Sequence, residues 1–222
     1  MKGELVVYNK PKSNISEDIR TIRTNLQFIS SAQDSKVLLV TSSVPGEGKS
    51  FISANLACAF AQTGETTLIV DCDLRLGRTH KIFNISNSKG LSNLLASSDV
   101  LDCADFIKKT TINDLYVIPR GTVPPNPSEL LNSPNMKKLI NFLRESFDHI
   151  IFDGVPVNGL PDSLVMASMV DKVIIVSAMG YTDIDELNET KKALQKIDAD
   201  IAGVIVNKAQ KNNRGKYSNY YE

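Results

Sequence analysis

The stretch KVLLVTSSVPGEGKSF, residues 36–51, decides the fold, because it joins a strand pattern to a glycine-rich turn and to the start of a helix. Residues 36–42 are apolar and lack the alternation of a half-exposed strand. Such a run is typical of a strand buried on both faces, as in a parallel sheet covered by helices. The residues that follow, 50–64, have the spacing of an amphipathic helix that stops at Gly64.

The turn between strand and helix has the composition of a phosphate-binding loop. Gly46 and Gly48 allow the backbone to point N–H groups at an anion, and the positive end of the following helix adds attraction. Lys49 can then reach the β and γ phosphates of a nucleotide, and the Ser50 hydroxyl can hold Mg²⁺. Ser43 replaces the first glycine of the usual pattern G-x-x-x-x-G-K-[ST]. We predict a nucleotide-binding loop made of Pro45, Gly46, Glu47, Gly48, Lys49, Ser50 and Phe51.

Further strand and helix patterns alternate along the chain. Apolar runs predict more strands buried on both faces at 67–71, 148–153, 171–177 and 201–207, and a further strand at 115–119. Helical spacing predicts helices at 14–32, 90–99, 128–147 with a break at Pro134, and 183–197. The first of these helices has Ser16 as its expected cap, and we expect it to pack as an outer helix or to dock on a neighbouring subunit. The alternation predicts a doubly wound α/β fold with a mostly parallel sheet, like that of P-loop NTPases.

Composition narrows the classes of protein that fit. The 222 residues contain 25 Lys plus Arg and 25 Asp plus Glu, so the positive field of a nucleic-acid binder is missing and we expect no nucleic-acid partner. The three cysteines show no metal-binding or disulfide spacing, which indicates a reducing cytoplasm. No apolar run approaches the roughly 18 residues of a membrane span, and the N-terminus has no signal-peptide pattern.

Acidic residues follow two of the predicted strands. Asp71 and Asp73 end the second core strand in LIVDCDLR, and Asp153 ends HIIFD. The carboxyl ends of parallel strands meet at one edge of the sheet, where ligands of open α/β folds bind. Strand-end aspartates also cap turns, but a third acidic residue after an apolar run favours a Mg²⁺ site.

Taken together, these motifs resemble those of the bacterial tyrosine kinases of the capsule and exopolysaccharide type (BY-kinases), which are P-loop enzymes. The resemblance runs from about residue 16 to the C-terminus and includes PGEGKS, DCDLR, IIFD, RGTVPPNPSELL and a tyrosine-bearing tail. The helix pattern E-x-x-R-x-x-R is present as Glu17, Arg20 and Arg23. Members often have Asp-Thr/Ser-Pro-Pro at the third motif, whereas Gly154 and Val155 follow the aspartate here, so this segment departs from the family pattern.

The resemblance implies an ATP-dependent protein-tyrosine kinase that uses Mg²⁺. Lys49 and the loop amides would hold the phosphates, and Ser50, Asp73 and Asp153 would hold the metal. A tyrosine hydroxyl has a pKa near 10, so it needs a carboxylate to accept its proton. We assign that role to Asp71, although Asp71 and Asp73 could exchange roles. For Arg75, stabilisation of phosphate charge and pairing with an acidic neighbour are equally acceptable roles.

The tail would be the substrate. Residues 214–222, RGKYSNYYE, contain half of the six tyrosines in a stretch that can bury little surface. A phosphoacceptor must leave its own fold to enter an active site, so such a tail suits that role. The expected acceptors, phosphorylated in trans, are Tyr217, Tyr220 and Tyr221.

The resemblance also implies partners and a division of the chain. Residues 1–35 would carry an oligomerisation helix, in which Glu17, Arg20 and Arg23 contact the next subunit of a homo-oligomeric ring such as an octamer. Residues 36–209 would be the kinase core and residues 210–222 the flexible tail. A membrane activator (a polysaccharide co-polymerase) would recruit the cytoplasmic kinase to the inner face of the membrane. A tyrosine phosphatase and other protein substrates would complete a system that regulates polysaccharide synthesis.

Two alternatives remain on sequence grounds. A positioning or partitioning ATPase of the related P-loop class would carry an additional lysine where this chain has Val44, and often a basic amphipathic C-terminal helix. A non-catalytic scaffold would bind nucleotide without transferring phosphate. The acidic and basic residues predicted for the site favour an enzyme over a scaffold.

Overall fold

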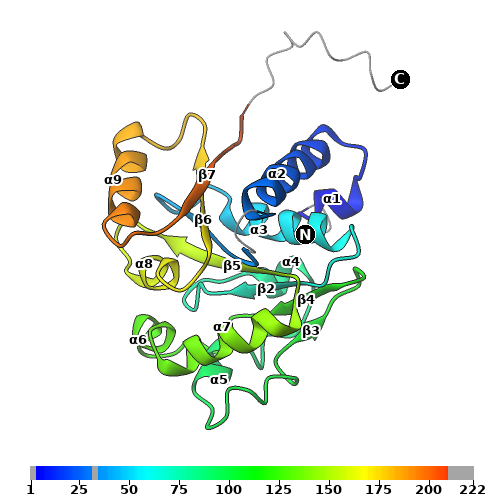
Figure 1. Ribbon diagram of the computed structural model, residues 1–222, viewed down its shortest axis with the longest axis vertical. Helices are drawn as coiled ribbons and strands as arrows, with labels where there is room; N and C mark the ends of the chain where they lie inside the picture. Colours follow the sequence, from blue (N-terminus) through cyan, green and yellow to red (C-terminus); the bar gives the residue numbers. More distant parts are fainter. Residues whose placement is uncertain (1–3, 32–34, 210–222) are drawn as a thin grey trace.

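The computed structural model describes residues 4–31 and 35–209, which form a sheet covered by helices on both faces (Figure 1). The sheet has seven strands in the order β3-β4-β2-β5-β1-β6-β7. All neighbouring strands are parallel except β3 and β4. The strands are β1 (Val37–Ser42), β2 (Thr67–Asp71), β3 (Lys108–Lys109), β4 (Leu115–Ile118), β5 (His149–Pro156), β6 (Lys172–Ala178) and β7 (Ile201–Asn207). The predicted α/β class with a mostly parallel sheet is confirmed.

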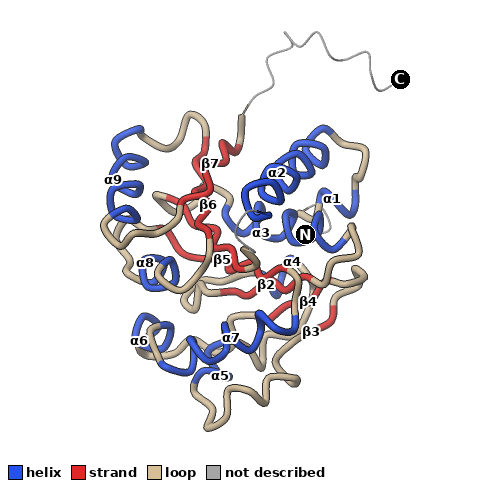
Figure 2. The backbone as a smooth tube through the Cα atoms, in the orientation of Figure 1, coloured by secondary structure: helices blue, strands red, loops and turns tan. Residues whose placement is uncertain are grey.

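Helices divide between the two faces of the sheet, as the tube in Figure 2 shows. On one face lie α1 to α4, and on the other α5 to α9. The helices are α1 (Val6–Asn9), α2 (Asn14–Ser31), α3 (Lys49–Ala61), α4 (Thr79–Ile82), α5 (Leu91–Leu95), α6 (Pro127–Leu131), α7 (Pro134–Ser146), α8 (Asp162–Ala167) and α9 (Ile184–Gln195).

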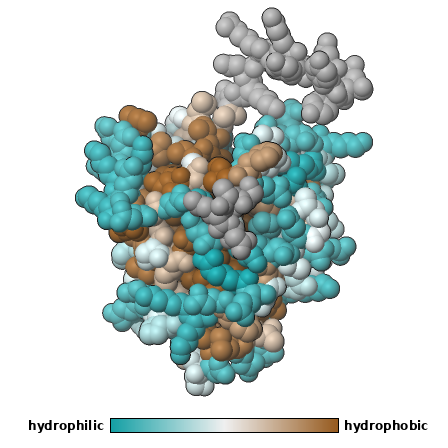
Figure 3. All heavy atoms as spheres, in the orientation of Figure 1, coloured by the Kyte–Doolittle hydropathy of each residue, from teal (hydrophilic) through white to brown (hydrophobic). Residues whose placement is uncertain are grey.

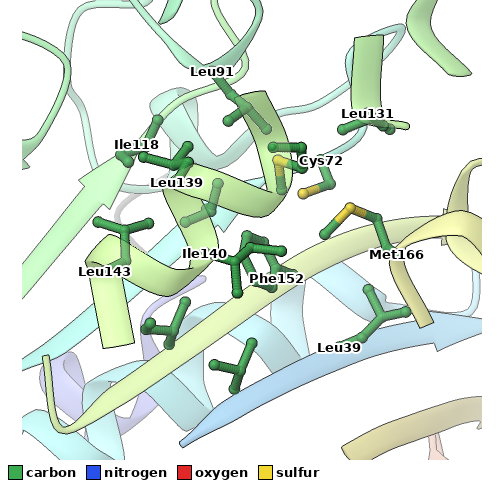
Figure 4. Packing of buried hydrophobic residues seen from close by; sticks show 14 of the residues in the cluster. Leu39, Cys72, Leu91, Ile118, Leu131, Leu139, Ile140, Leu143, Phe152 and Met166 are labelled. Carbon is green, nitrogen blue, oxygen red and sulfur yellow. The ribbon is translucent and has the colours of Figure 1, made fainter. Parts of the chain in front are cut away.

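Each face of the sheet has its own hydrophobic core. On the α7 side, Leu139, Ile140 and Leu143 pack with Phe152 of β5 and Leu39 of β1 (Figure 4). On the opposite side, residues of α2 and α3 pack with the other faces of the same strands. The central strands β1 and β2 are buried throughout, as continuous apolar runs predict.

Three details differ from the prediction. The helix α3 is buried on almost all sides rather than amphipathic, because α1 and α2 cover the side that faces away from the sheet. Ser16 lies inside α2 and donates to Lys10 O at 2.7 Å, whereas Ser13 accepts the capping bond from Ser16 N at 3.2 Å.

The third difference is β7, which was predicted to be buried on both faces. Among the described residues it is the last strand of the sheet and pairs only with β6, so Val204 and Val206 are 45% and 56% exposed. Figure 3 shows hydrophobic surface in this region, between α9 and α2. An apolar run identifies a strand but does not give its place in the sheet.

Candidate active site

The phosphate-binding loop lies between β1 and α3, at the carboxyl edge of the sheet. Gly46 and Gly48 adopt left-handed backbone conformations, with φ of 82° and 100°, that favour glycine. At Gly48 a side chain is also excluded, because a Cβ atom would lie 2.1 Å from the Asn207 side-chain nitrogen. Lys49 begins α3, so the loop ends at a helix N-terminus of the kind that binds anions.

Asp71 and Asp153 lie side by side at this edge. They are register partners on the adjacent parallel strands β2 and β5, and the amide of Cys72 donates to the carbonyl of Asp153 at 2.9 Å. Both carboxyl groups are fully buried. The sheet therefore brings together two acidic residues that lie far apart in the sequence, as predicted.

Asp71 is held by α4. Its Oδ2 atom accepts hydrogen bonds from Thr79 N at 3.0 Å and from Thr79 Oγ1 at 2.7 Å, while Oδ1 accepts a longer bond from Asp73 N at 3.3 Å. Burial and then the nearby charge of Asp153 raise the pKa of Asp71, against the effect of the Thr79 hydrogen bonds. Gly77 keeps side-chain atoms away from the less engaged oxygen, because a Cβ there would lie 2.2 Å from Oδ1.

Asp153 lies next to the phosphate-binding loop. Its Oδ1 atom accepts from Ser53 Oγ of α3 at 3.0 Å. Burial raises the pKa of Asp153, and the neighbouring Ser50 hydroxyl and Lys49 ammonium oppose that rise. Burial also lowers the pKa of Lys49, against the charges of Asp153 and Asp73. These mutual effects show that Lys49, Ser50, Asp73 and Asp153 share one electrostatic environment.

Asp73 is more open than the other two aspartates, and it shapes the turn after β2. Its Oδ1 atom accepts from the amides of Arg75 and Leu76 at 3.2 and 2.8 Å. The Arg75 guanidinium extends to the buried carboxylate of Asp162 at 3.4 Å, so the acidic-neighbour role considered for this arginine is the one observed here. Ser128 of α6 also donates to Asp162, so this carboxylate links α6, which follows the Pro-rich loop, to the DCDLR turn.

The residues at the site fit a magnesium nucleotide. Asp153 Oδ2 and Ser43 Oγ are buried without a hydrogen-bond partner in the described part of the chain, and such orphaned buried atoms call for a ligand. Within residues 4–31 and 35–209, no group of three or more His, Cys, Asp or Glu side chains forms a cation site. Mg²⁺ in nucleotide sites uses one or two carboxylates together with phosphates and water, so a full acidic cage is not required.

Close packing around Gly154 leaves little room for a larger residue after the aspartate of the third motif. Gly154 lies inside β5, and a Cβ there would meet Ser163 Oγ at 2.8 Å and Leu39 Cδ1 at 2.9 Å. The Ser163 hydroxyl bonds the backbone of Val155 twice, accepting from its amide at 3.0 Å and donating to its carbonyl at 2.6 Å. The hydroxyl of Ser163 therefore occupies the space into which a side chain at position 154 would extend.

Glu17, Arg20 and Arg23 of α2 make two different kinds of contact. Arg20 bonds Glu17 at 2.5 Å and the carbonyl of Pro11 at 2.8 Å. Arg23 instead donates to the carbonyl of Ala59 in α3 at 3.0 Å, so it connects two helices of the same chain. The three predicted acceptors Tyr217, Tyr220 and Tyr221 lie outside the described residues.

Glu47 was predicted to be part of the loop but was assigned no role of its own. The contacts of Thr79 and Thr182 were not predicted. Glu47 is fully buried and bonds Thr182, and Thr79 bonds Asp71. Each of these contacts joins residues whose relation appears only after folding. A glutamate between two loop glycines was the one available signal, because that position is usually described as free to vary.

Known proteins of one nucleotide-binding family are similar to this chain. Residues 38–221 match the family described as the CobQ/CobB/MinD/ParA nucleotide binding domain. The tyrosine-protein kinase YwqD of Bacillus subtilis is 34% identical over 220 residues, which cover 99% of this chain and 92% of the relative. The tyrosine-protein kinase etk of Escherichia coli is 33% identical over 210 residues, which cover 95% of this chain and 29% of that longer protein.

Solved structures agree with these sequence relatives. The chimerical protein CapA2B2 has a TM-score of 0.88 and 39% identity, with 94% of this chain and 91% of that chain covered. The kinase domain of the Escherichia coli tyrosine kinase ETK has a TM-score of 0.87 and 30% identity, with 96% and 84% covered. The cell division ATPase MinD of Pyrococcus furiosus has a TM-score of 0.68 at 22% identity, with 81% and 75% covered, which shows a shared fold alone.

Proposed function

We infer from these relatives that the chain belongs to the bacterial tyrosine kinases within the CobQ/CobB/MinD/ParA nucleotide-binding family. We propose that it transfers the γ-phosphoryl group of ATP to its own C-terminal tyrosines in trans. The observation that supports this proposal most is the meeting of the P-loop with Asp71 and Asp153 at one sheet edge, in a chain similar over nearly its full length to a tyrosine kinase.

Lys49 and the loop amides would position the phosphates. Phosphoryl transfer requires alignment and charge neutralisation more than covalent assistance from the protein. The Lys49 ammonium, at the start of α3, is set to compensate charge on the β and γ phosphates as the bond to the leaving oxygen breaks. When bound, Mg²⁺ would neutralise phosphate charge, and Ser50, Asp73 and Asp153 would hold it directly or through water.

Asp71 would act as the base. In the reaction the tyrosine oxygen forms a bond to the γ-phosphorus, the bond to the β,γ-bridging oxygen breaks, and the hydroxyl proton is transferred to a carboxylate oxygen. Burial raises the pKa of Asp71 to about 8, so its carboxylate holds a proton far better than an exposed aspartate does. Asp71 Oδ1, beside Gly77, is the oxygen with fewer hydrogen bonds and is our choice for the acceptor atom.

The division of the chain follows from this mechanism. We propose that residues 1–35 serve assembly, with Glu17, Arg20 and Arg23 at the contact between subunits of a ring, that residues 36–209 are the kinase core, and that residues 210–222 are the substrate tail. Phosphates on the tail would add negative charge at each subunit contact and loosen the ring.

A second protein would bring the kinase to the membrane. No helix within residues 4–31 and 35–209 is long and apolar enough to cross a bilayer. The likeness to a protein described as the chimerical CapA2B2 supports a partner protein, which we propose is a membrane activator of polysaccharide synthesis. A tyrosine phosphatase would reverse the modification, and other protein substrates would extend its effect.

The test is intact-mass spectrometry of the purified chain before and after Mg-ATP, with the cytoplasmic segment of the activator supplied, followed by peptide mapping. We expect phosphate on Tyr217, Tyr220 or Tyr221, no phosphate in Lys49→Met, and normal phosphate in Lys137→Met, which removes an exposed lysine of α7. Release of ADP with an unmodified tail would contradict the proposal and favour a switch ATPase.

A further inference from the structure

Glu47, the second residue of G-E-G-K-S, places a buried carboxylate in the phosphate-binding loop. Glu47 has no exposed surface, and its carboxylate points into the protein at the loop tip. A negative charge beside a polyphosphate site opposes nucleotide binding by repulsion. A buried acid at this position therefore needs a compensating role.

Three donors meet the carboxylate of Glu47. Its Oε2 atom accepts from the amide of Val44 in the same loop at 2.8 Å. Its Oε1 atom accepts from the amide of Ala178, at the end of β6, at 3.2 Å, and from the hydroxyl of Thr182. The Glu47 side chain therefore forms a hydrogen bond within the loop and also bonds the loop to the turn between β6 and α9.

Asn207, the last residue of β7, and Lys208, which follows it, bond the backbone of the same loop. Asn207 Nδ2 donates to the carbonyl of Glu47 at 2.8 Å, and Lys208 Nζ donates to the carbonyl of Gly46 at 2.8 Å. Lys208 also lies 5.0 Å from the centre of the Tyr181 ring. Because N–H and C=O point in opposite directions across a trans peptide, these two bonds also fix the directions of the Glu47 and Gly48 amides.

We propose that Glu47 is a positioning residue that holds the phosphate-binding loop in its anion-binding shape through the turn at Ala178–Thr182. The inference rests on nucleotide binding by the loop and deepens the proposed kinase function. It requires a carboxylate, because an amide carries one acceptor oxygen. In Glu47→Gln the NH₂ group would face either Val44 N–H or Ala178 N–H, donor against donor.

The experiment measures Mg-ATP binding by calorimetry well below the melting temperature, and then KM and kcat for tail phosphorylation. We expect Glu47→Gln to weaken binding roughly ten-fold, as the loss of a hydrogen bond to a charged group implies. We expect Thr182→Val to weaken it about three-fold and Thr182→Ser, which keeps the hydroxyl, to restore it. KM should rise more than kcat falls, because the loop binds phosphates in both the ground and transition states.

The matched control is Thr67→Val. Thr67 is a buried threonine at the start of β2, and its hydroxyl donates to the carbonyl of Glu65 at 3.0 Å, at the end of the strand opposite the loop. If Glu47 had a merely structural role, Thr182→Val and Thr67→Val would lower the melting temperature alike and leave the affinity unchanged, which would overturn the proposal. A double variant of Glu47→Gln and Thr182→Val should bind no more weakly than Glu47→Gln alone.

The wild-type measurement separates this inference from the proposed function. Failure of the wild-type chain to bind Mg-ATP would contradict the kinase proposal itself. Tight binding by wild type and by Glu47→Gln alike would overturn the role of Glu47 and leave the kinase proposal standing.

Discussion

At the scale of single residues, Asp71 combines a proposed role in catalysis with a cost to stability. Burial, and after it the charge of Asp153, raises the pKa of Asp71 to about 8 in the folded protein. The folded state therefore binds a proton more tightly than the unfolded chain does. The stability from this proton is fully present below the unfolded pKa, near pH 4, and is lost as the pH rises through about 8.

We predict that Asp71→Asn stabilises the nucleotide-free protein while it abolishes tyrosine phosphorylation. The melting temperature of wild type should fall between about pH 5 and about pH 8. The melting temperature of the variant should fall much less over this range, because position 71 then has no carboxyl group to ionise. At pH 8 the variant should melt roughly 2–4 °C higher, about the shift that 1 kcal/mol produces in a chain of this size. Scanning calorimetry across pH provides the measurement.

Asp102→Asn, which changes an exposed aspartate, is the control for the loss of one charge. An Asp71→Asn protein that melts at or below wild type at pH 8 would show that the Thr79 hydrogen bonds outweigh the burial of charge.

The sequence was sufficient to locate the phosphate loop and the three aspartates, because each follows a recognisable apolar run, although β5 continues past Asp153 to Pro156. It was not sufficient for Thr79, Thr182 or the contacts of Glu47. Thr182 is 135 residues from Glu47, and no local pattern marks a contact over that separation. Such hydrogen bonds form only when the chain folds, whereas the ends of strands are marked by hydrophobicity in the sequence itself.

At the scale of secondary-structure elements, β5 allows a test of the family pattern. We predict that Gly154→Ser, which introduces a residue of the expected family pattern, destabilises the fold by about 1–3 kcal/mol, the usual cost of overpacking. The added Cβ would meet Ser163 Oγ and Leu39 Cδ1 within 3 Å. Urea unfolding measures the effect.

A second substitution identifies the cause. Ser163→Ala removes the oxygen that the new side chain meets, so the double variant should recover part of the loss, and the two effects should not add. Simple additivity would mean that Leu39 and the backbone of Val40 are the main obstacles.

The helix α2 carries both the proposed subunit contact and a contact within the fold. We predict that Glu17→Ala with Arg20→Ala reduces oligomer size while the melting temperature changes little, because this exposed ion pair is a kind that contributes under 1 kcal/mol. Arg23→Ala should instead lower the melting temperature, since Arg23 bonds the carbonyl of Ala59 in α3. Light scattering after size exclusion, paired with thermal melts, distinguishes the two. Equal melting losses in both variants would contradict this division.

Elements were predicted well where hydrophobic periodicity was strong and poorly where length was short. The strands β1, β2, β5 and β6 were found from their apolar runs, as was the break before α7. The helices α1 and α4 each span four residues, too few for periodicity to register. The edge position of β7 depends on strand order, which hydrophobicity does not encode.

At the scale of the whole molecule, the proposed substrate segment follows β7, a strand whose last residue contacts the phosphate loop. Asn207 and Lys208, at the end of β7, contact the carbonyls of Glu47 and Gly46, and the tail follows directly. An extended chain spans about 3.3–3.6 Å per residue, so the segment from Lys208 to Tyr217 could reach roughly 30 Å. Reach alone therefore permits phosphorylation both within one chain and between chains.

We predict that transfer occurs between chains. A Lys49→Met chain with its full tail, mixed with an active chain that ends at residue 209, should gain phosphate from Mg-ATP, and the different masses of the two chains identify the product. The same mixture with Glu17→Ala and Arg20→Ala in both chains should react more slowly, because the proposed contact between subunits is removed. If wild type instead phosphorylates itself at a rate independent of concentration while the Lys49→Met chain stays unmodified, each active site uses its own tail. The ring would then have no part in presenting the substrate.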